Sequence, residues 1–234
     1  MPSINTVFVL CTIGICMPTL AQSQTQVLQS IHINTSDTTQ YLDWAEEAMP
    51  IISANQLSTN AGVCVPSFGA EEEGDLYVYT FSADFESSMA IDLTSGVPAR
   101  EIAKIAPHRT IKSRDLWSTV RLSTNLNIDI GDTYSMLMTV ASTDQPDMYL
   151  TQIDALEAGM HEAGHRDVHF LVSLVMTGKF RNALNVRLLA PTPERLGAAM
   201  DTITTATWAG NMISNLSSIR TVRQQMTVNC HRFH

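Results

Sequence analysis

The sequence predicts an α+β fold in which two βαββαβ units follow one another along the chain. Segments with the two-residue period of strands and segments with apolar residues at helical spacing occur in the order β-α-β-β-α-β, and this order occurs twice. The 234 residues, 44% of them hydrophobic and 16% charged, are enough for two small domains of roughly 100 residues each. One such unit leaves an apolar sheet face uncovered, so two units can bury those faces against each other.

The first unit is expected at residues 22–131. A helical apolar pattern in it contains Pro50, which predicts a kink or a break, and Asn60-Ala61-Gly62 is typical of a helix end. Pro66 predicts an edge position for its strand, because proline cannot donate a hydrogen bond to a neighbouring strand. Strands are expected at residues 26–34, 63–68, 76–81 and within 116–130, and helices at 41–52, 85–92 and 99–106.

The second unit, residues 132–234, repeats this order. Its first helix is expected to open at Pro146 and to end at Ala163-Gly164. Arg109-Thr110-Ile111 of the first unit aligns with Arg220-Thr221-Val222 of the second, although the repeat depends on element order more than on residue identity. Strands are expected at residues 134–140, 168–176, 184–189 and 220–230, and a second helical region begins at 192.

In its topology the chain resembles the dimeric α/β-barrel superfamily, the antibiotic-biosynthesis-monooxygenase-like proteins, with two units fused head to tail. The resemblance implies two tandem ferredoxin-like (βαββαβ) units packed sheet to sheet as a pseudo-dimeric α/β barrel. Members of that group include cofactor-independent oxygenases, haem enzymes, isomerases and binding proteins, so the fold alone assigns no function. No motif of one member is present, and no site residue is carried over from the group.

The N-terminal segment predicts export. Residues 4–20 are uncharged and mostly apolar, and Thr19-Leu20-Ala21 places small residues at the −3 and −1 positions of a cleavage site. Residues 1–21 are therefore interpreted as a secretory signal peptide, with a mature chain that begins at Gln22. No later segment is apolar enough for a membrane anchor, so a secreted or periplasmic protein is expected.

The four cysteines divide into two groups. Cys11 and Cys16 lie in the predicted signal peptide, whereas Cys64 and Cys230 lie near the two ends of the folded part. In an oxidising compartment these two could form a disulfide, and the alternative is a pair of buried free thiols. The sequence leaves both open, because it does not give the distance between their side chains.

Charge and missing motifs exclude several classes of function. The net charge of −9, with no run of Lys or Arg, disfavours binding to nucleic acid and to anionic membrane surfaces. The sequence contains no G-x-G-x-x-G motif and no P-loop, so it gives no support to nucleotide binding through these motifs. It also contains no G-x-S-x-G motif, so it gives no support to a serine nucleophile.

The motif His161-Glu162-Ala163-Gly164-His165 has the spacing of a zinc-binding HExxH helix. In a secreted zinc metallopeptidase, His161 and His165 would bind zinc and Glu162 would act as the general base. Gly164 instead predicts the end of the helix, charged residues follow, and the third histidine of the extended motif is missing. The favoured interpretation has no metal, no cofactor and no catalytic residue, and the zinc enzyme is kept as an alternative.

The favoured function is the binding of a small, largely apolar molecule between the two sheets. Polar and aromatic strand residues are the candidates that could reach such a pocket: Tyr77, Tyr79, His169 and Arg187. The alternative for each of them is a structural role in packing. A structural or self-association module, with the paired units as a surface for a second copy, is a further alternative.

Overall fold

The structure is a computed structural model that describes residues 26–123 and 132–234, so the signal peptide expected at residues 1–21 lies outside the described residues. The end of the fourth predicted strand, residues 124–130, also lies outside them. The strands are β1 (Val27–Thr35), β2 (Ser58–Phe68), β3 (Asp75–Ser82), β4 (Arg109–Arg121), β5 (Thr133–Ser142), β6 (His169–Val175), β7 (Leu184–Ala190) and β8 (Thr221–Arg232). The helices are α1 (Thr38–Ala54), α2 (Phe85–Met89), α3 (Gly96–Ile105), α4 (Pro146–Glu162), α5 (Pro193–Thr205) and α6 (Thr207–Ile219), with a 3-10 turn at Ala106–His108.

The strands close into an antiparallel barrel in the order β1-β3-β2-β8-β5-β7-β6-β4. The first unit supplies the run β4-β1-β3-β2 and the second the equivalent run β8-β5-β7-β6. The two runs join at their edges, through β2 with β8 and β4 with β6. The predicted α+β fold of two ferredoxin-like units in one pseudo-dimeric barrel is confirmed. The boundary expected between residues 131 and 132 stays a prediction.

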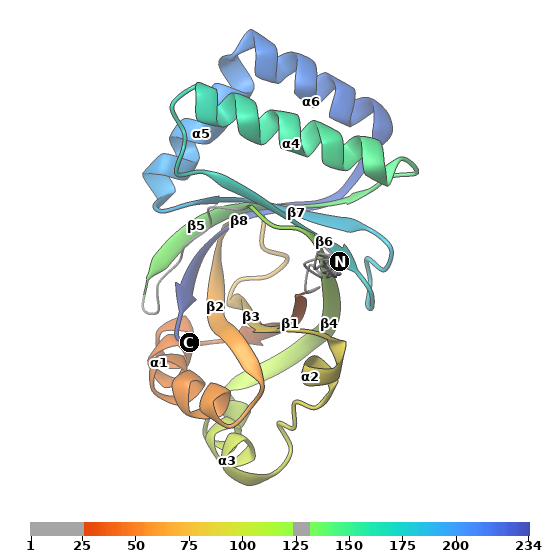
Figure 1. The fold of residues 1–234 in the computed structure, drawn as a ribbon. Coiled ribbons are helices and arrows are strands. Elements are labelled where there is room, and N and C mark those ends of the chain that lie inside the picture. Colours follow the sequence, from red (N-terminus) through yellow and green to blue (C-terminus); the bar gives the residue numbers. More distant parts are fainter. Residues whose placement is uncertain (1–25, 124–131) are drawn as a thin grey trace, which may run out of the picture.

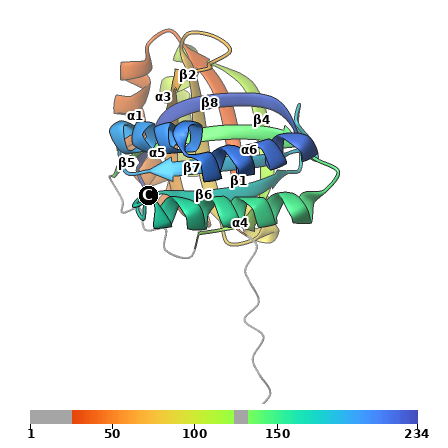
Figure 2. The ribbon, with the colours of Figure 1, turned by 90° about the horizontal axis from the view of Figure 1, so that it is seen from above.

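The helices lie outside the barrel, in two groups on opposite sides. Helices α1, α2 and α3 cover the sheet of the first unit, and α4, α5 and α6 cover that of the second (Figure 1; Figure 2 looks down on the second group). Each group buries an apolar cluster against the outer face of the barrel, and a third cluster fills part of its interior. Within the described part of the chain, no helix combines the length and the apolar character needed to cross a membrane.

The two units contain one matching pair of buried contacts. The side chain of Tyr41 in α1 is inaccessible to solvent, and its hydroxyl accepts a hydrogen bond from Arg109 Nη1 at 3.0 Å. Tyr149 in α4 is equally buried and accepts from Arg220 Nη1 at 2.9 Å. Each arginine precedes or begins the last strand of its unit, as the alignment of the two segments requires.

Two local predictions for the first unit were wrong, and of the kink or break expected at Pro50 the break does not occur. Asn60-Ala61-Gly62 does not end a helix but lies inside β2, where a Cβ on Gly62 would meet the carbonyl oxygen of His231 at 2.1 Å. Pro66 is not on an edge strand, because the barrel is closed, and it lies where the pairing with β8 changes register. Helix α1 continues past Pro50, which is exposed, so water can satisfy the carbonyl group that the proline leaves without a donor.

Candidate ligand-binding site

The barrel encloses a cavity of about 370 Å³ that opens to solvent. Its wall is formed by strands of both units, since alternate residues of a strand point to the same face of a sheet. The first unit contributes an aromatic wall, and the second contributes two methionines, a tyrosine and two arginines, Arg187 and Arg232. The aromatic, methionine and arginine side chains of this wall include Tyr77, Tyr79, Phe81, Trp117, Tyr134, Met136, Met138 and Arg187.

Arg187 is the more deeply buried of the two arginines in this wall. It lies on β7 between Val186 and Leu188, whose side chains point the other way into the cluster beneath the helices. Arg187 is 4% exposed, and its Nη2 donates a hydrogen bond to Ser173 Oγ at 2.6 Å. Its Nε atom is buried and has no hydrogen-bond partner in the described part of the chain. The arginine therefore retains an unsatisfied donor inside the barrel.

Two aromatic rings flank the guanidinium group. The central carbon atom of the group lies 5.9 Å from the ring centroid of Phe81 and 5.9 Å from that of Trp117. Both distances are within the range of a cation–π interaction, which holds a cation in an apolar site without neutralising it. Among the described residues, Arg187 makes no ion pair with a carboxylate.

The protonation states follow from burial. Loss of water contact lowers the pKa of Arg187 to about 10, so the group is still charged at neutral pH. Burial raises the pKa of Tyr79 and that of Tyr134, although Arg187 and Arg232 act in the opposite direction on both phenols. Both tyrosines are therefore protonated at neutral pH. The site presents two guanidinium groups, those of Arg187 and Arg232, and neutral tyrosine hydroxyl groups on walls that combine apolar and polar side chains.

The sequence-predicted residues separate into two places. Tyr77, Tyr79 and Arg187 line the cavity, whereas His169 lies outside its lining, beneath helix α4. Sequence reasoning missed Trp117 and Tyr134, although alternation within the predicted strand at residues 134–140 places Tyr134 on the same face as Met136 and Met138. Trp117 gave no such signal, because its strand could not be assigned a buried face from the sequence.

The HEAGH motif does not form a zinc helix. Helix α4 ends at Glu162, and Gly164 has φ = 97°, so the predicted helix end at Ala163-Gly164 is confirmed. His161 Nε2 lies 2.9 Å from the carbonyl oxygen of Val168. His165 Nε2 instead lies 2.8 Å from the hydroxyl of Thr202 on α5. The spacing that would place both imidazoles on one helical face is lost, and the proposed pairing of His161 with His165 on zinc is wrong in its geometry.

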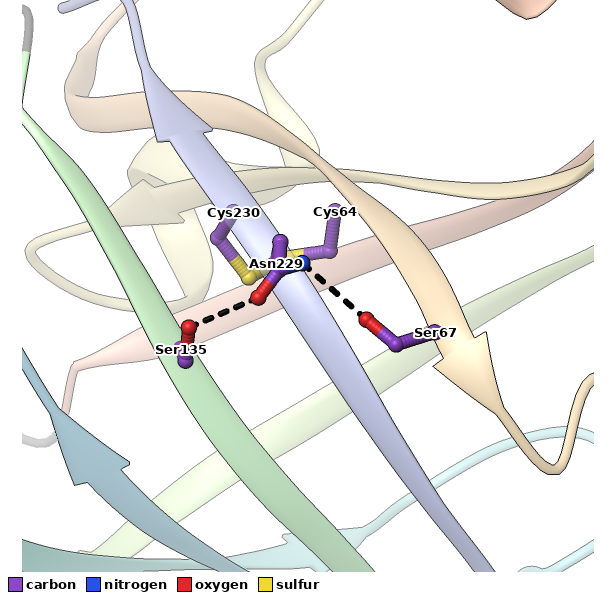
Figure 3. Close-up of a disulfide and its surroundings, with 5 residues drawn as sticks. All are labelled: Cys64, Ser67, Ser135, Asn229 and Cys230. Carbon is purple, nitrogen blue, oxygen red and sulfur yellow. Dashed lines mark hydrogen bonds between the residues drawn. A yellow bond between two sulfur atoms is a disulfide. The ribbon is translucent and has the colours of Figure 1, made fainter. Parts of the chain in front are cut away.

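Cys64 and Cys230 form a disulfide with their Sγ atoms 2.06 Å apart, so the alternative of two free thiols is wrong. They are directly paired residues on β2 and β8, and the bond therefore crosses one of the two junctions between the units. Figure 3 shows the neighbouring Asn229, whose Oδ1 accepts from Ser135 Oγ at 2.7 Å and whose Nδ2 donates to Ser67 Oγ at 3.0 Å. Covalent and polar links thus join β2, β8 and β5 at this junction.

Comparison with known proteins finds similarity in structure alone. No family model matches the sequence, and no curated protein matches it. A candidate monooxygenase from Fusobacterium nucleatum aligns with a TM-score of 0.62 and 8% identity over 91% of this chain and 94% of that one. A second candidate monooxygenase, from Lactobacillus acidophilus, aligns with a TM-score of 0.57 and 10% identity over 90% of this chain and 95% of that one. A dye-decolorizing peroxidase from Bacteroides thetaiotaomicron aligns with a TM-score of 0.53 and 10% identity over 91% of this chain and 94% of that one. At these identities the comparisons establish the dimeric α/β-barrel fold, as the resemblance implied, and no activity.

Proposed function

We propose that this dimeric α/β barrel in a single chain is an exported protein that binds a small, largely apolar molecule in its cavity, with an anionic group of that molecule placed against Arg187. The observation that carries the proposal is a buried guanidinium group, held between two aromatic rings, with no carboxylate partner in the described residues. A buried charge without a counter-ion is costly, and a ligand carboxylate, phenolate or enolate would supply one.

The size and lining of the cavity support the same ligand class. A volume of about 370 Å³ is within the usual range for small-molecule sites, which combine apolar walls with a few polar groups that orient the ligand. Aromatic rings and methionines would contact the body of the ligand. Tyr79 and Tyr134 are hydrogen-bonded to each other next to Arg187, and the pair has one hydroxyl proton left to donate to a ligand. A planar molecule with one acidic end fits the arrangement best.

Export is supported by two independent features. A disulfide joins β2 to β8, and such bonds persist in oxidising compartments outside the cytosol. The predicted signal peptide at residues 1–21 directs the chain to such a compartment. A secreted or periplasmic location is therefore part of the proposal. A structural or self-association role stays a prediction, which the mass of the protein in solution would test.

The binding test compares two probes of matched shape, 2-naphthoate and the neutral 2-naphthylmethanol, by calorimetry. A hydrogen-bonded ion pair with Arg187 contributes about 1.5–3 kcal/mol, so we expect the carboxylate to bind about 10- to 100-fold more tightly than the alcohol. In Arg187→Met this preference should disappear, while Arg187→Lys should keep part of it. The exposed Arg223 provides the matched control, and Arg223→Met should leave both affinities unchanged.

Two outcomes would overturn the proposal. One is equal binding of the acid and the alcohol by the unmodified protein, or binding of neither at millimolar concentration. The other is an Arg187→Met protein that keeps the preference for the carboxylate. A melting curve of each variant separates loss of binding from loss of folding, and replacement of a buried cation by methionine is a change that folded proteins tolerate.

A further inference from the structure

We propose that Glu157, His161 and His169 form a binding site for a divalent transition-metal ion of the zinc type, at the place where α4 covers the start of β6. One potential ligand atom from each of the three residues lies within 4.8 Å of the other two. Glu157 and His161 are one helical turn apart on α4, and His169 is the first residue of β6. The first histidine of the HEAGH motif is thus combined with a glutamate four residues before it and with a histidine on the next strand.

The hydrogen bond of His161 directs one of its nitrogens to the site. Nε2 lies 2.9 Å from the carbonyl oxygen of Val168, and a carbonyl oxygen can only accept, so Nε2 carries the proton. In the neutral ring Nδ1 then holds the free lone pair. A backbone carbonyl that accepts from one imidazole nitrogen while the other binds the ion is the usual arrangement of a metal-bound histidine.

His169 faces the same place from the strand. The ring centroids of His161 and His169 are 5.8 Å apart and their planes are inclined by 79°. His169 Nδ1 lies 3.7 Å from Glu157 Oε1 and 2.9 Å from the hydroxyl of Ser123. A ring nitrogen in a hydrogen bond with this hydroxyl has no lone pair free for an ion. His169 would therefore bind through Nε2 while Nδ1 donates to Ser123, or it would release the Ser123 contact and bind through Nδ1.

Glu157 is held in place by a backbone amide and an arginine. It is 7% exposed, its Oε1 accepts from the backbone amide of Phe170 at 3.0 Å, and its Oε2 is paired with Arg121. Arg121 also pairs with Asp154 at 2.5 Å. Two carboxylates therefore face one guanidinium group, and with neutral histidines the cluster carries a net charge of −1, which favours a cation. A carboxylate has about four lone-pair positions, so Oε1 can keep its amide donor and still bind the ion.

The ligand chemistry selects the class of metal. Two imidazoles and one carboxylate suit Zn²⁺, Co²⁺ or Ni²⁺, whereas Mg²⁺ and Ca²⁺ prefer oxygen ligands alone. Bonds of about 2.0–2.2 Å in a tetrahedral site place ligand atoms roughly 3.4 Å apart, so movements of the side chains by about 1 Å would close the site. Three protein ligands leave the fourth position to a water molecule.

The test uses the untagged, dialysed protein with Zn²⁺ or Co²⁺ alone. We expect one ion per chain by calorimetry, a visible absorption band of tetrahedral Co²⁺, and a higher melting temperature with Zn²⁺. His161→Ala and His169→Ala should each weaken binding at least about tenfold and abolish the Co²⁺ band. The exposed His108 gives the matched control, and His108→Ala should bind as the unmodified protein does.

A further variant separates this site from the HEAGH pairing. His165→Ala should keep the Co²⁺ band, because the His165 side chain is hydrogen-bonded to Thr202 and is not one of the three ligands. The proposal is overturned if binding survives in His161→Ala or His169→Ala, if it depends on His165 instead of His169, or if neither ion binds at a concentration of about 100 µM. Because Glu157, His161 and His169 do not line the cavity, these outcomes are independent of the naphthoate test.

Discussion

Breaking the disulfide between Cys64 and Cys230 is expected to destabilise the barrel strongly. The two residues are 166 positions apart in the sequence, so the bond restricts most of the unfolded chain. The chain-entropy relation for a loop of that length gives about 5 kcal/mol at 25 °C, an upper estimate because real unfolded chains are partly compact. For a protein of this size 1 kcal/mol corresponds to about 2–4 °C in melting temperature. We therefore expect a decrease of about 10 °C, and of no more than about 20 °C.

The measurement is differential scanning calorimetry with and without a reducing agent, with alkylation and mass determination to establish that both thiols are free. The Cys64→Ser/Cys230→Ser double variant is the control, and its melting temperature should match that of the reduced protein and be insensitive to the reductant. A change of less than about 2 °C in fully reduced protein would refute the reasoning. It would mean that the pairing of β2 with β8 is maintained by packing and hydrogen bonds alone.

Two further predictions concern buried charges. Arg121→Met should lower the free energy of unfolding, measured in urea, by about 3 kcal/mol, because it leaves the buried Glu157 carboxylate without its cation. The double variant Arg121→Met/Glu157→Gln should recover most of this loss. An Arg121→Met protein as stable as the unmodified one would contradict this. Burial alone would raise the pKa of Asp75, but hydrogen bonds from the Asn34 side chain, the Glu72 amide and His32 outweigh it and hold this pKa below the ordinary 3.8. A carboxyl group with a lowered pKa in the folded state stabilises fully above pH 3.8 and loses this contribution as the pH falls below that value. Asp75→Asn should therefore flatten the decline in unfolding free energy between about pH 4 and pH 2 and cost about 1.5–3 kcal/mol at pH 7; an unchanged acid slope would count against the argument.

The local signals in the sequence were reliable where each had one physical meaning. Gly164 predicted the end of α4, and its positive φ is a conformation that favours glycine. Gly62 misled because glycine serves two purposes. It can end a helix, but here it allows close approach of the His231 carbonyl from a strand 169 positions further along the sequence.

The candidate site shows the same division. Alternation within strands identified Tyr77, Tyr79 and Arg187 as side chains that could share a face, and all three line the cavity. The sequence could not tell that Arg187 would lack a carboxylate partner, because that depends on which side chains of both units meet inside the barrel. His169 has the same strand periodicity, yet its place at the start of β6 puts it beside Glu157 and His161 instead.

The order of strands and helices and the end of α4 were determined by the sequence itself, since they depend on periodicity and backbone preference over a few residues. The closure of the barrel, the surroundings of Arg187 and the grouping of Glu157 with His161 and His169 were decided only by the tertiary structure. The physical reason is that β2 meets β8 and β4 meets β6 across the two units. Such edge pairings bring together side chains that no local pattern relates.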